Sequence, residues 1–144
     1  MYPITLNLKN KEVLIIGGGK IAARKVRGLL KEDAKVKIIS PTLYSSISKE
    51  SVEWLEKIYE TGDIIGNESL IFACTDNNEL NEQIRKDAHS SQMVNVVSNK
   101  KVSDFYNMSM IKYKGVNIGI STEGASPMIA KQTRVELEEW LKNK

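Results

Sequence analysis

The sequence predicts an α/β protein built on a doubly wound parallel sheet, followed by a short segment of a different kind. Three observations carry this prediction. Strand-like and helix-like patterns alternate along residues 1–106, two of the strand-like runs have no polar interruption, and three glycines directly follow the first of these runs. Unbroken apolar runs are typical of strands that helices cover on both faces, and strands that alternate with helices favour a parallel sheet.

The first apolar run and its glycines predict a nucleotide-binding turn. Val13–Ile16 reads as a buried strand, and Gly17, Gly19 and Ala22 then fit the pattern G-x-G-x-x-[GA]. In this Rossmann-like fingerprint the first glycine makes a tight turn, the second leaves room for a pyrophosphate, and the small third residue lets the next helix pack on the strand. The alternative is a glycine-rich turn that binds nothing.

The remaining elements of residues 1–106 follow in order. Apolar residues at three- and four-residue spacing predict a helix over 22–31, and the strand at 36–39 ends at Ser40-Pro41. The other expected elements are a short edge strand within 2–8, strands at 52–59 and 69–74, a helix over 77–89 capped by Asn77 or Asn78, and a strand at 93–97.

The pattern changes in residues 107–144. Residues 108–112 and 116–121 alternate with period two around Tyr113-Lys114-Gly115, which predicts an antiparallel hairpin. Ser126 and Pro127 are suited to the cap and first position of a terminal helix over 128–143. We therefore expect a dinucleotide-binding domain at 1–106 and a hairpin-plus-helix segment at 107–144.

Composition excludes several classes of protein. The 144 residues carry a net charge of only +3, which disfavours nucleic acid as a partner, and no apolar run is long enough to span a membrane. A single cysteine, Cys74, and a single histidine, His89, predict neither a disulfide nor a metal site. Cys74 lies in an apolar run and is expected to be a buried core residue. We expect a cytoplasmic protein.

Four motifs together resemble the siroheme synthase family, and specifically its precorrin-2 dehydrogenase module. They are 17–25 (GGGKIAARK), 73–77 (ACTDN), 94–97 (VNVV) and 121–127 (STEGASP), in the family's order along almost the whole chain. The resemblance implies NAD-dependent oxidation of precorrin-2, a tetrapyrrole, to sirohydrochlorin. It also implies a homodimer in which residues 107–144 dimerise and cover the substrate. The family's segment usually continues through several more helices, so this one is expected to be minimal or truncated.

The resemblance also assigns the cofactor site. The implied cofactor-binding residues are Gly17, Gly18, Gly19, Lys20 and Ile21 around the pyrophosphate, Ser40, Pro41 and Thr42 beside the adenosine ribose, and Thr75, Asp76, Asn95 and Val97 on the nicotinamide side. The acidic residue that usually binds the ribose after the second strand is absent, because Ser40 stands there. No arginine replaces it, so the choice of NAD rather than NADP as the cofactor rests on the family resemblance.

The proton acceptor departs from the family pattern. An aspartate follows Asn-Val-Val in the family, whereas Ser98 follows it here, and a neutral hydroxyl is a poor base. The catalytic candidates are therefore Ser98 and a displaced carboxylate at Asp104. Asp76 is another candidate. The alternative for Asp104 is a solvated loop residue with no catalytic role.

Two further features of the sequence suit precorrin-2, whose carboxylates need cations or backbone donors. Two functions other than dehydrogenation also stay open. Seven cations are available as substrate ligands or as ordinary surface charges: Arg24, Lys25, Lys100, Lys101, Lys112, Lys131 and Arg134. Residues 121–127 offer an anion-receptive helix start or a bare structural cap. The alternatives to a dehydrogenase are an additional or sole ferrochelatase activity on sirohydrochlorin and a dinucleotide-sensing domain without turnover.

Overall fold

The computed structural model describes all residues, 1–144, and the chain divides into two compact units. One unit comprises residues 3–105, and the other comprises residues 106–144 together with residues 1–2. Each unit is described by itself. None of the helices combines the length and the apolar character that crossing a membrane requires.

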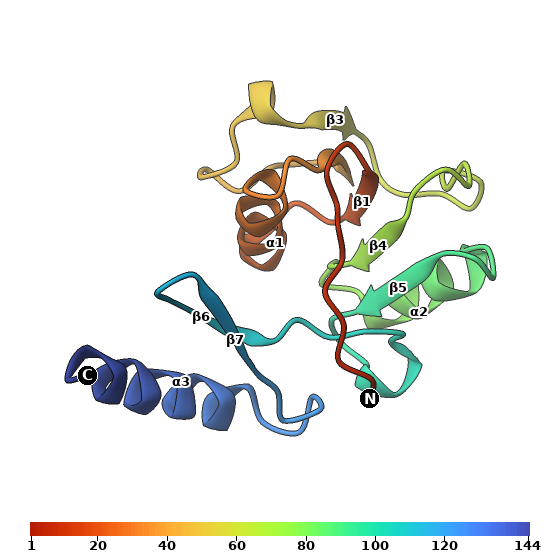
Figure 1. Ribbon diagram of the computed structural model, residues 1–144. Coiled ribbons are helices and arrows are strands. Elements are labelled where there is room, and N and C mark those ends of the chain that lie inside the picture. Colours follow the sequence, from red (N-terminus) through yellow and green to blue (C-terminus); the bar gives the residue numbers. More distant parts are fainter. The chain divides into compact units, whose positions relative to one another are not determined.

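A five-stranded parallel sheet forms the centre of residues 3–105, in the order β3-β2-β1-β4-β5 (Figure 1). Its elements are β1 (Glu12–Ile16), α1 (Lys20–Leu30), β2 (Lys35–Ser40), the short 3-10 helix η1 (Lys49–Ser51), β3 (Glu53–Glu56), β4 (Leu70–Ala73), α2 (Asn78–Asp87), β5 (Met93–Val96) and the 3-10 helix η2 (Lys100–Val102). The strand order 3-2-1-4-5, in which the chain first adds strands on one side of β1 and then on the other, is that of a Rossmann-like sheet. The predicted fold class is confirmed.

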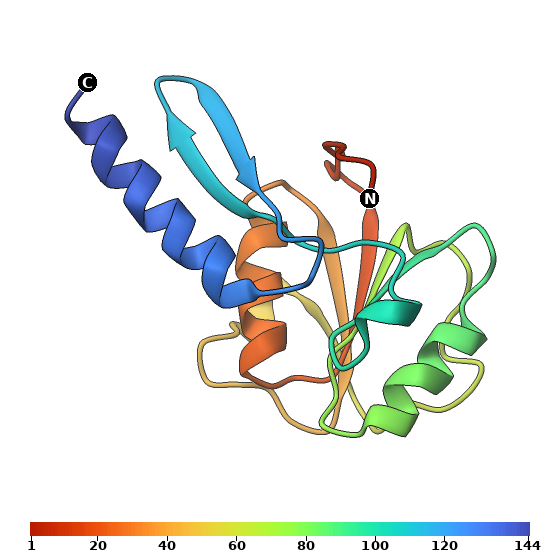
Figure 2. The same ribbon diagram turned by 90° about the horizontal axis from the view of Figure 1, so that it is seen from below.

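Strand β1 is the centre of the sheet because its apolar residues alternate between two buried faces. Val13 and Ile15 pack in one core cluster with α1, and Leu14 and Ile16 pack in a second cluster with Ile84 of α2. The two helices therefore cover opposite faces of the sheet (Figures 1 and 2). All four side chains of this run are at most 1% exposed, as an unbroken apolar strand predicts.

The parallel register brings the strand ends together. Ile16 at the end of β1 lies opposite Ile39 of β2 on one side and Ala73 of β4 on the other. The residues that follow these strands consequently meet at one edge of the sheet, which is the edge where open α/β sheets bind ligands.

The outer edge of β5 is closed by the chain itself. The backbone N–H of Asp104 donates to the carbonyl of Val94 at 2.8 Å, and the backbone N–H of Val94 donates to the Asp104 carboxylate at 2.8 Å. The hydroxyl of Ser103 accepts from the N–H of Val96 at 2.8 Å and donates to its carbonyl at 3.1 Å. These bonds satisfy polar groups that an edge strand would otherwise expose.

The second unit is a hairpin with a helix beside it (Figure 2). Strands β6 (Ser109–Tyr113) and β7 (Val116–Ile120) pair in antiparallel register, and the two turn residues Lys114 and Gly115 both have positive φ, at 46° and 81°. This is the twist-matching turn that two-residue hairpins prefer. Helix α3 (Pro127–Lys142) begins after Ser126, whose hydroxyl accepts from the N–H of Ile129 at 3.2 Å.

Two expected strands differ in the structure. Residues 2–8 form no strand, because their alternation has no core face to bury: Tyr2, Ile4 and Leu6 are 87%, 51% and 43% exposed. The expected strand at 52–59 is shorter, since β3 ends at Glu56 and the chain then turns through residues 57–63. The other predicted elements are present, with ends that differ by a residue or two.

Candidate functional site

The first two glycines of the turn after β1 are required by the protein's own backbone. Gly17 has a φ of +105°, and a Cβ there would stand 2.5 Å from the carbonyl oxygen of Cys74. A Cβ on Gly18 would stand 2.0 Å from the carbonyl oxygen of Thr42. Both distances are far inside contact, so the turn packs against the ends of β4 and β2 with no room for a side chain.

Gly19 is different, because the space beside it is open. No atom lies within 4 Å of the position that its Cβ would take, and its φ of −81° is ordinary. Gly19 is also the N-cap of α1, where no side chain caps the helix and the first turn carries no acidic residue. The unpaired N–H groups and positive dipole end of α1 therefore suit an anion such as a pyrophosphate.

A pocket of about 290 Å³ lies at this edge of the sheet. Eight of the predicted cofactor-binding residues line it: Gly17, Gly18, Gly19, Ser40, Pro41, Thr42, Thr75 and Asp76. The other lining residues are Ile16, Ile39, Ile58, Tyr59, Cys74 and Leu80. The lining includes no lysine, arginine or histidine, so any binding of an anion here depends on backbone N–H groups and hydroxyls.

Four predicted cofactor-binding residues lie outside the pocket lining. Lys20 and Ile21 form the exposed first turn of α1. Asn95 is 7% exposed within β5, and its side-chain amide donates to the carbonyl of Phe105 at 2.9 Å. Val97 extends the pairing of β5 through its N–H, which donates to the carbonyl of Ala73 at 3.1 Å.

Ser40 is the last residue of β2, at the place where dinucleotide-binding domains usually carry the acidic residue that binds the ribose. Its side chain is only 2% exposed, and its hydroxyl donates to the carbonyl of Thr42 at 2.8 Å. Its own carbonyl accepts from the indole N–H of Trp54 at 3.0 Å. The serine is therefore held by its own loop and by β3, close against Gly18.

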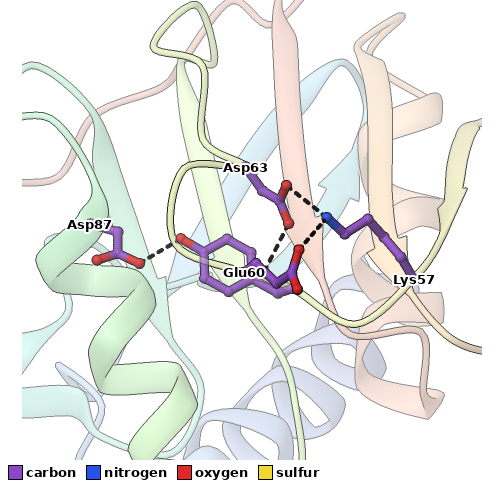
Figure 3. Close-up of polar contacts among 5 residues, drawn as sticks. Lys57, Glu60, Asp63 and Asp87 are labelled. Atoms are coloured by element: carbon purple, nitrogen blue, oxygen red, sulfur yellow. Dashed lines mark hydrogen bonds and ion pairs between the residues drawn. The ribbon is translucent and has the colours of Figure 1, made fainter.

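The loop at 57–63 supplies two pocket residues that the sequence patterns did not indicate, Ile58 and Tyr59. Lys57 donates to Asp63 at 3.0 Å and to Glu60 at 3.1 Å, and the N–H of Glu60 donates to Asp63 at 2.8 Å (Figure 3). The hydrogen bonds that Lys57 donates to Asp63 and Glu60 raise the pKa of Lys57. This charged turn fixes the loop, and Ile58 stays 67% exposed at the pocket.

The same loop is anchored to the C-terminal turn of α2. The hydroxyl of Tyr59 donates to the Asp87 carboxylate at 2.8 Å, and the hydroxyl of Thr61 donates to it at 3.0 Å. Burial and the neighbouring Asp87 carboxylate raise the pKa of Tyr59. Burial works to raise the pKa of Asp87, but the hydrogen bonds from Tyr59, Gln83 and Thr61 outweigh it, so the pKa lies below its usual value.

Asn81 of α2 is a second feature that sequence reasoning missed. Its side chain is fully buried and bonds to Thr75, which follows β4, and to Ser98, which follows β5. The catalytic candidate Ser98 is exposed and lies beside the loop of Thr75 and Asp76. The only available signal was an asparagine on the apolar face of a predicted helix.

Asp104, the other catalytic candidate, lies elsewhere along β5. Its carboxylate accepts from the N–H of Val94 at 2.8 Å and pairs with Arg85 at 2.9 Å. Val94 is the second residue of β5, whereas Ser98 follows the end of the strand. The structure therefore does not bring Asp104 and Ser98 together.

Cys74 is a core residue, as expected. Its side chain is 5% exposed, and burial raises the pKa of its thiol to about 12, which leaves the reactive thiolate essentially absent. Lys25 of α1 lies over the ring of Phe72 at 5.0 Å, and burial lowers its pKa. Nowhere do three or more His, Cys, Asp or Glu side chains lie close enough to share a metal ion.

Hydrogen bonds within the segment 121–127 order the chain before α3. The hydroxyl of Thr122 donates to the carbonyl of Ser126 at 3.0 Å and accepts from its N–H at 3.0 Å. Among the candidate substrate cations, Arg134 pairs with both carboxylate oxygens of Glu138 at 2.7 and 2.8 Å.

Comparisons with known proteins agree with this geometry. Residues 4–109 match a family model described as putative NAD(P)-binding. The chain is 40% identical over 141 residues to a siroheme synthase of Actinobacillus pleuropneumoniae serotype 7 (strain AP76), covering 94% of this chain and 29% of that protein. It is 32% identical over 136 residues to a precorrin-2 dehydrogenase of Bacillus subtilis (strain 168), covering 92% of this chain and 83% of that protein.

A solved structure is similar along nearly the whole chain. The structure titled SirC, precorrin-2 dehydrogenase, matches with a TM-score of 0.85 and 28% identity over 96% of this chain and 70% of that one. The chain spans less than a third of the length of the siroheme synthases that it matches.

The contrast between Gly19 and Gly17 gives a direct test of the pocket. We expect Gly19→Ala to keep the thermal stability of the wild type, because its Cβ enters open space, but to weaken NADH binding about tenfold by filling the approach to the helix N-terminus. NADH fluorescence and thermal melts measure the two effects. Gly17→Ala is the matched control and should lose stability by about 2 kcal/mol or more through strain at positive φ. Unchanged NADH affinity in Gly19→Ala would contradict this pocket.

Asp104→Asn separates the structural role of Asp104 from a catalytic one. The amide loses the charge that pairs with Arg85 and weakens the bond from Val94, so we expect a loss of about 1–2 kcal/mol in urea unfolding. Any NAD-dependent turnover that the wild type shows should stay within about twofold in this variant. Glu56→Gln, at an exposed carboxylate on the opposite edge strand, is the control for stability. A collapse of turnover in the folded variant would instead make Asp104 the proton acceptor.

Proposed function

Since the chain belongs to the precorrin-2 dehydrogenase family, we propose that it oxidises precorrin-2 to sirohydrochlorin with NAD, a step of siroheme synthesis. The observation that carries the proposal is the open space beside Gly19, at an uncapped helix N-terminus within the pocket where β1, β2 and β4 end. The match to a precorrin-2 dehydrogenase along most of both chains supports the same reaction.

The residues present fit a dinucleotide, and we assign their roles accordingly. The N–H groups after Gly19 hold the pyrophosphate, the segment 40–42 with Ile58 borders the adenosine, and Thr75 and Asp76 border the nicotinamide. The absence of any cation in the pocket lining favours NAD over NADP, whose extra phosphate needs one. When bound, NAD supplies the hydride acceptor, and the protein positions substrate and cofactor.

The second hydrogen of the substrate leaves as a proton, which needs an acceptor at the site. Ser98 is a neutral hydroxyl, and the Asp104 carboxylate already accepts from Val94 and Arg85. Asp76 is the one carboxylate that lines the pocket, and it is exposed. We therefore propose that the proton passes to Asp76 or to water near it, with Ser98 at the edge of the same site.

Turnover provides the decisive experiment. Mixing the protein with NAD and precorrin-2 should produce NADH absorbance together with the spectrum of sirohydrochlorin, and Gly19→Ala should slow both at limiting NAD. Asp76→Asn should lower kcat by about tenfold or more with little change in NADH affinity if Asp76 takes the proton. NADH binding without turnover would instead favour a sensing domain. Protein-dependent iron insertion into sirohydrochlorin would show a ferrochelatase.

We also propose that residues 107–144 dimerise, as the resemblance implies. In the unit formed by residues 106–144 and 1–2, large apolar side chains are exposed in a single chain: Met110, Val116, Met128, Ile129, Val135 and Trp140. Exposed apolar groups gathered on one small unit are typical of an interaction surface. The lone, buried cysteine is compatible with the reducing cytoplasm, which we propose as the location.

Sedimentation equilibrium tests the dimer. The wild type should sediment as a homodimer, and Trp140→Lys should shift it toward monomer, because a charge then replaces a 56% exposed apolar ring. A lysine near the end of α3 suits the helix dipole, so helix content should not fall. Glu139→Lys introduces the same residue at the neighbouring exposed position and should leave the dimer intact. A wild type that is monomeric at high concentration would exclude the dimer.

A further inference from the structure

The buried amide of Asn81 is the most deeply buried polar side chain of the protein. It is 0% exposed, on the face of α2 that packs toward the sheet. An amide in a core costs free energy unless all of its groups are hydrogen-bonded, and an apolar side chain would avoid that cost. The reason for an amide at this position must therefore lie in the groups to which it is hydrogen-bonded.

Every hydrogen-bonding group of Asn81 has a partner in the two neighbouring loops. Its Oδ1 accepts from the N–H of Thr75 at 3.0 Å and from the hydroxyl of Thr75 at 2.7 Å. Its Nδ2 donates to the carbonyl of Thr75 at 3.0 Å and to the hydroxyl oxygen of Ser98 at 3.2 Å. The amide thus joins the loop after β4 to the residue after β5.

The partners fix which way the amide faces. The reversed orientation would set an NH₂ group against the N–H of Thr75 and an oxygen against the carbonyl of Thr75. Nδ2 must therefore be the group that faces Ser98. A hydroxyl has a single hydrogen, so a serine oxygen that accepts from Asn81 keeps its own hydrogen for another partner.

Ser98 does not line the pocket itself, but it is exposed beside the pocket loop at Thr75. Ser98 is exposed, and Val97 before it is held to Ala73 of β4 by a 3.1 Å bond from its N–H. Its oxygen is one hydrogen bond from Asn81, which also holds Thr75 of the pocket lining. In open α/β sheets the ligand crosses the strand ends at this edge.

We propose that Asn81 is a positioning residue that makes the Ser98 hydroxyl a hydrogen-bond donor to an acceptor oxygen of the bound ligand. This inference rests on the proposed function and deepens it. The acceptor is a carbonyl or carboxylate oxygen, either the nicotinamide carboxamide of the dinucleotide or a carboxylate of the tetrapyrrole. Position 98 then serves recognition, and a carboxylate there would present an acceptor where the ligand also has one.

Substitutions at Ser98 test the donor. Ser98→Ala should weaken the binding of NADH or of sirohydrochlorin about three- to tenfold, the effect of one neutral hydrogen bond, and Ser98→Thr should restore it. NADH fluorescence and the absorbance of sirohydrochlorin measure the two affinities without turnover. A loss for NADH places the acceptor on the dinucleotide, and a loss for sirohydrochlorin places it on the tetrapyrrole.

A double-mutant cycle tests the positioning. In Asn81→Asp the side chain keeps its size but offers Ser98 an acceptor, so the hydroxyl turns toward residue 81 and the same affinity should fall. In the Ser98→Ala background the Asn81→Asp change should then cause no further loss. Equal losses in both backgrounds would show that Asn81 only supports the Thr75 loop, which overturns the inference.

One measurement needs no change at Asn81. If Asn81→Asp fails to fold, the side-chain amide signal of Asn81 in ¹H–¹⁵N spectra still reports the bond: its exchange with solvent should be faster in Ser98→Ala than in the wild type. Unchanged exchange of the Asn81 amide overturns the inference. Equal affinities of Ser98→Ala and the wild type for both NADH and sirohydrochlorin also overturn it, and so does a faster turnover in Ser98→Asp than in the wild type. A wild type that binds neither probe would instead remove the proposed function and this inference with it.

Discussion

The close packing of the glycine turn against the ends of β2 and β4 is the constraint on which the rest of the first unit depends. The backbone at Gly17 and Gly18 lies so near the carbonyls of Cys74 and Thr42 that even a methyl group would collide. This close approach holds the turn against the ends of both neighbouring strands, directly before α1 begins. All three glycines line the pocket, but Gly19 alone has open space beside its α-carbon.

The sequence predicted the parts of the structure that rest on local pattern and failed where long-range contacts decide. The unbroken apolar runs predicted the strands β1 and β4, and the glycine fingerprint predicted the turn that contains Gly17 and Gly19. Both patterns follow from backbone geometry. The alternation at residues 2–8 predicted a strand that is absent, since Tyr2, Ile4 and Leu6 are exposed and bury no face. The partners of Asn81 and Asp104 lie 6 to 19 residues away in the chain, and no periodicity encodes such a pairing.

Buried polar side chains in the first unit fix loops at both ends of the sheet. At the carboxyl edge, Ser40 and Asn81 hold the segments after β2 and β4. At the other edge, the buried Glu68 accepts from the N–H of Gly66 at 2.9 Å and from the amide of Gln92 at 2.9 Å. No buried side-chain nitrogen or oxygen lacks a partner, so these groups add order without the cost of an unsatisfied bond. The loops that line the pocket are therefore held in place by hydrogen bonds to buried side chains.

The hydrogen bonds that hold this edge suit a reaction that depends on how its reactants are positioned. Hydride transfer to NAD draws its reactivity from the cofactor, and its rate depends on how closely and how constantly the reacting carbon is held. A carboxylate after β5 would bring a charge that must be solvated, whereas the hydroxyl of Ser98 is fixed by one bond to a fully satisfied amide. The carboxylate nearest in sequence, Asp104, instead completes the edge of β5. The chain thus separates two tasks along one strand: a charge where the edge must be closed, and a neutral donor where the strand ends beside the pocket loop.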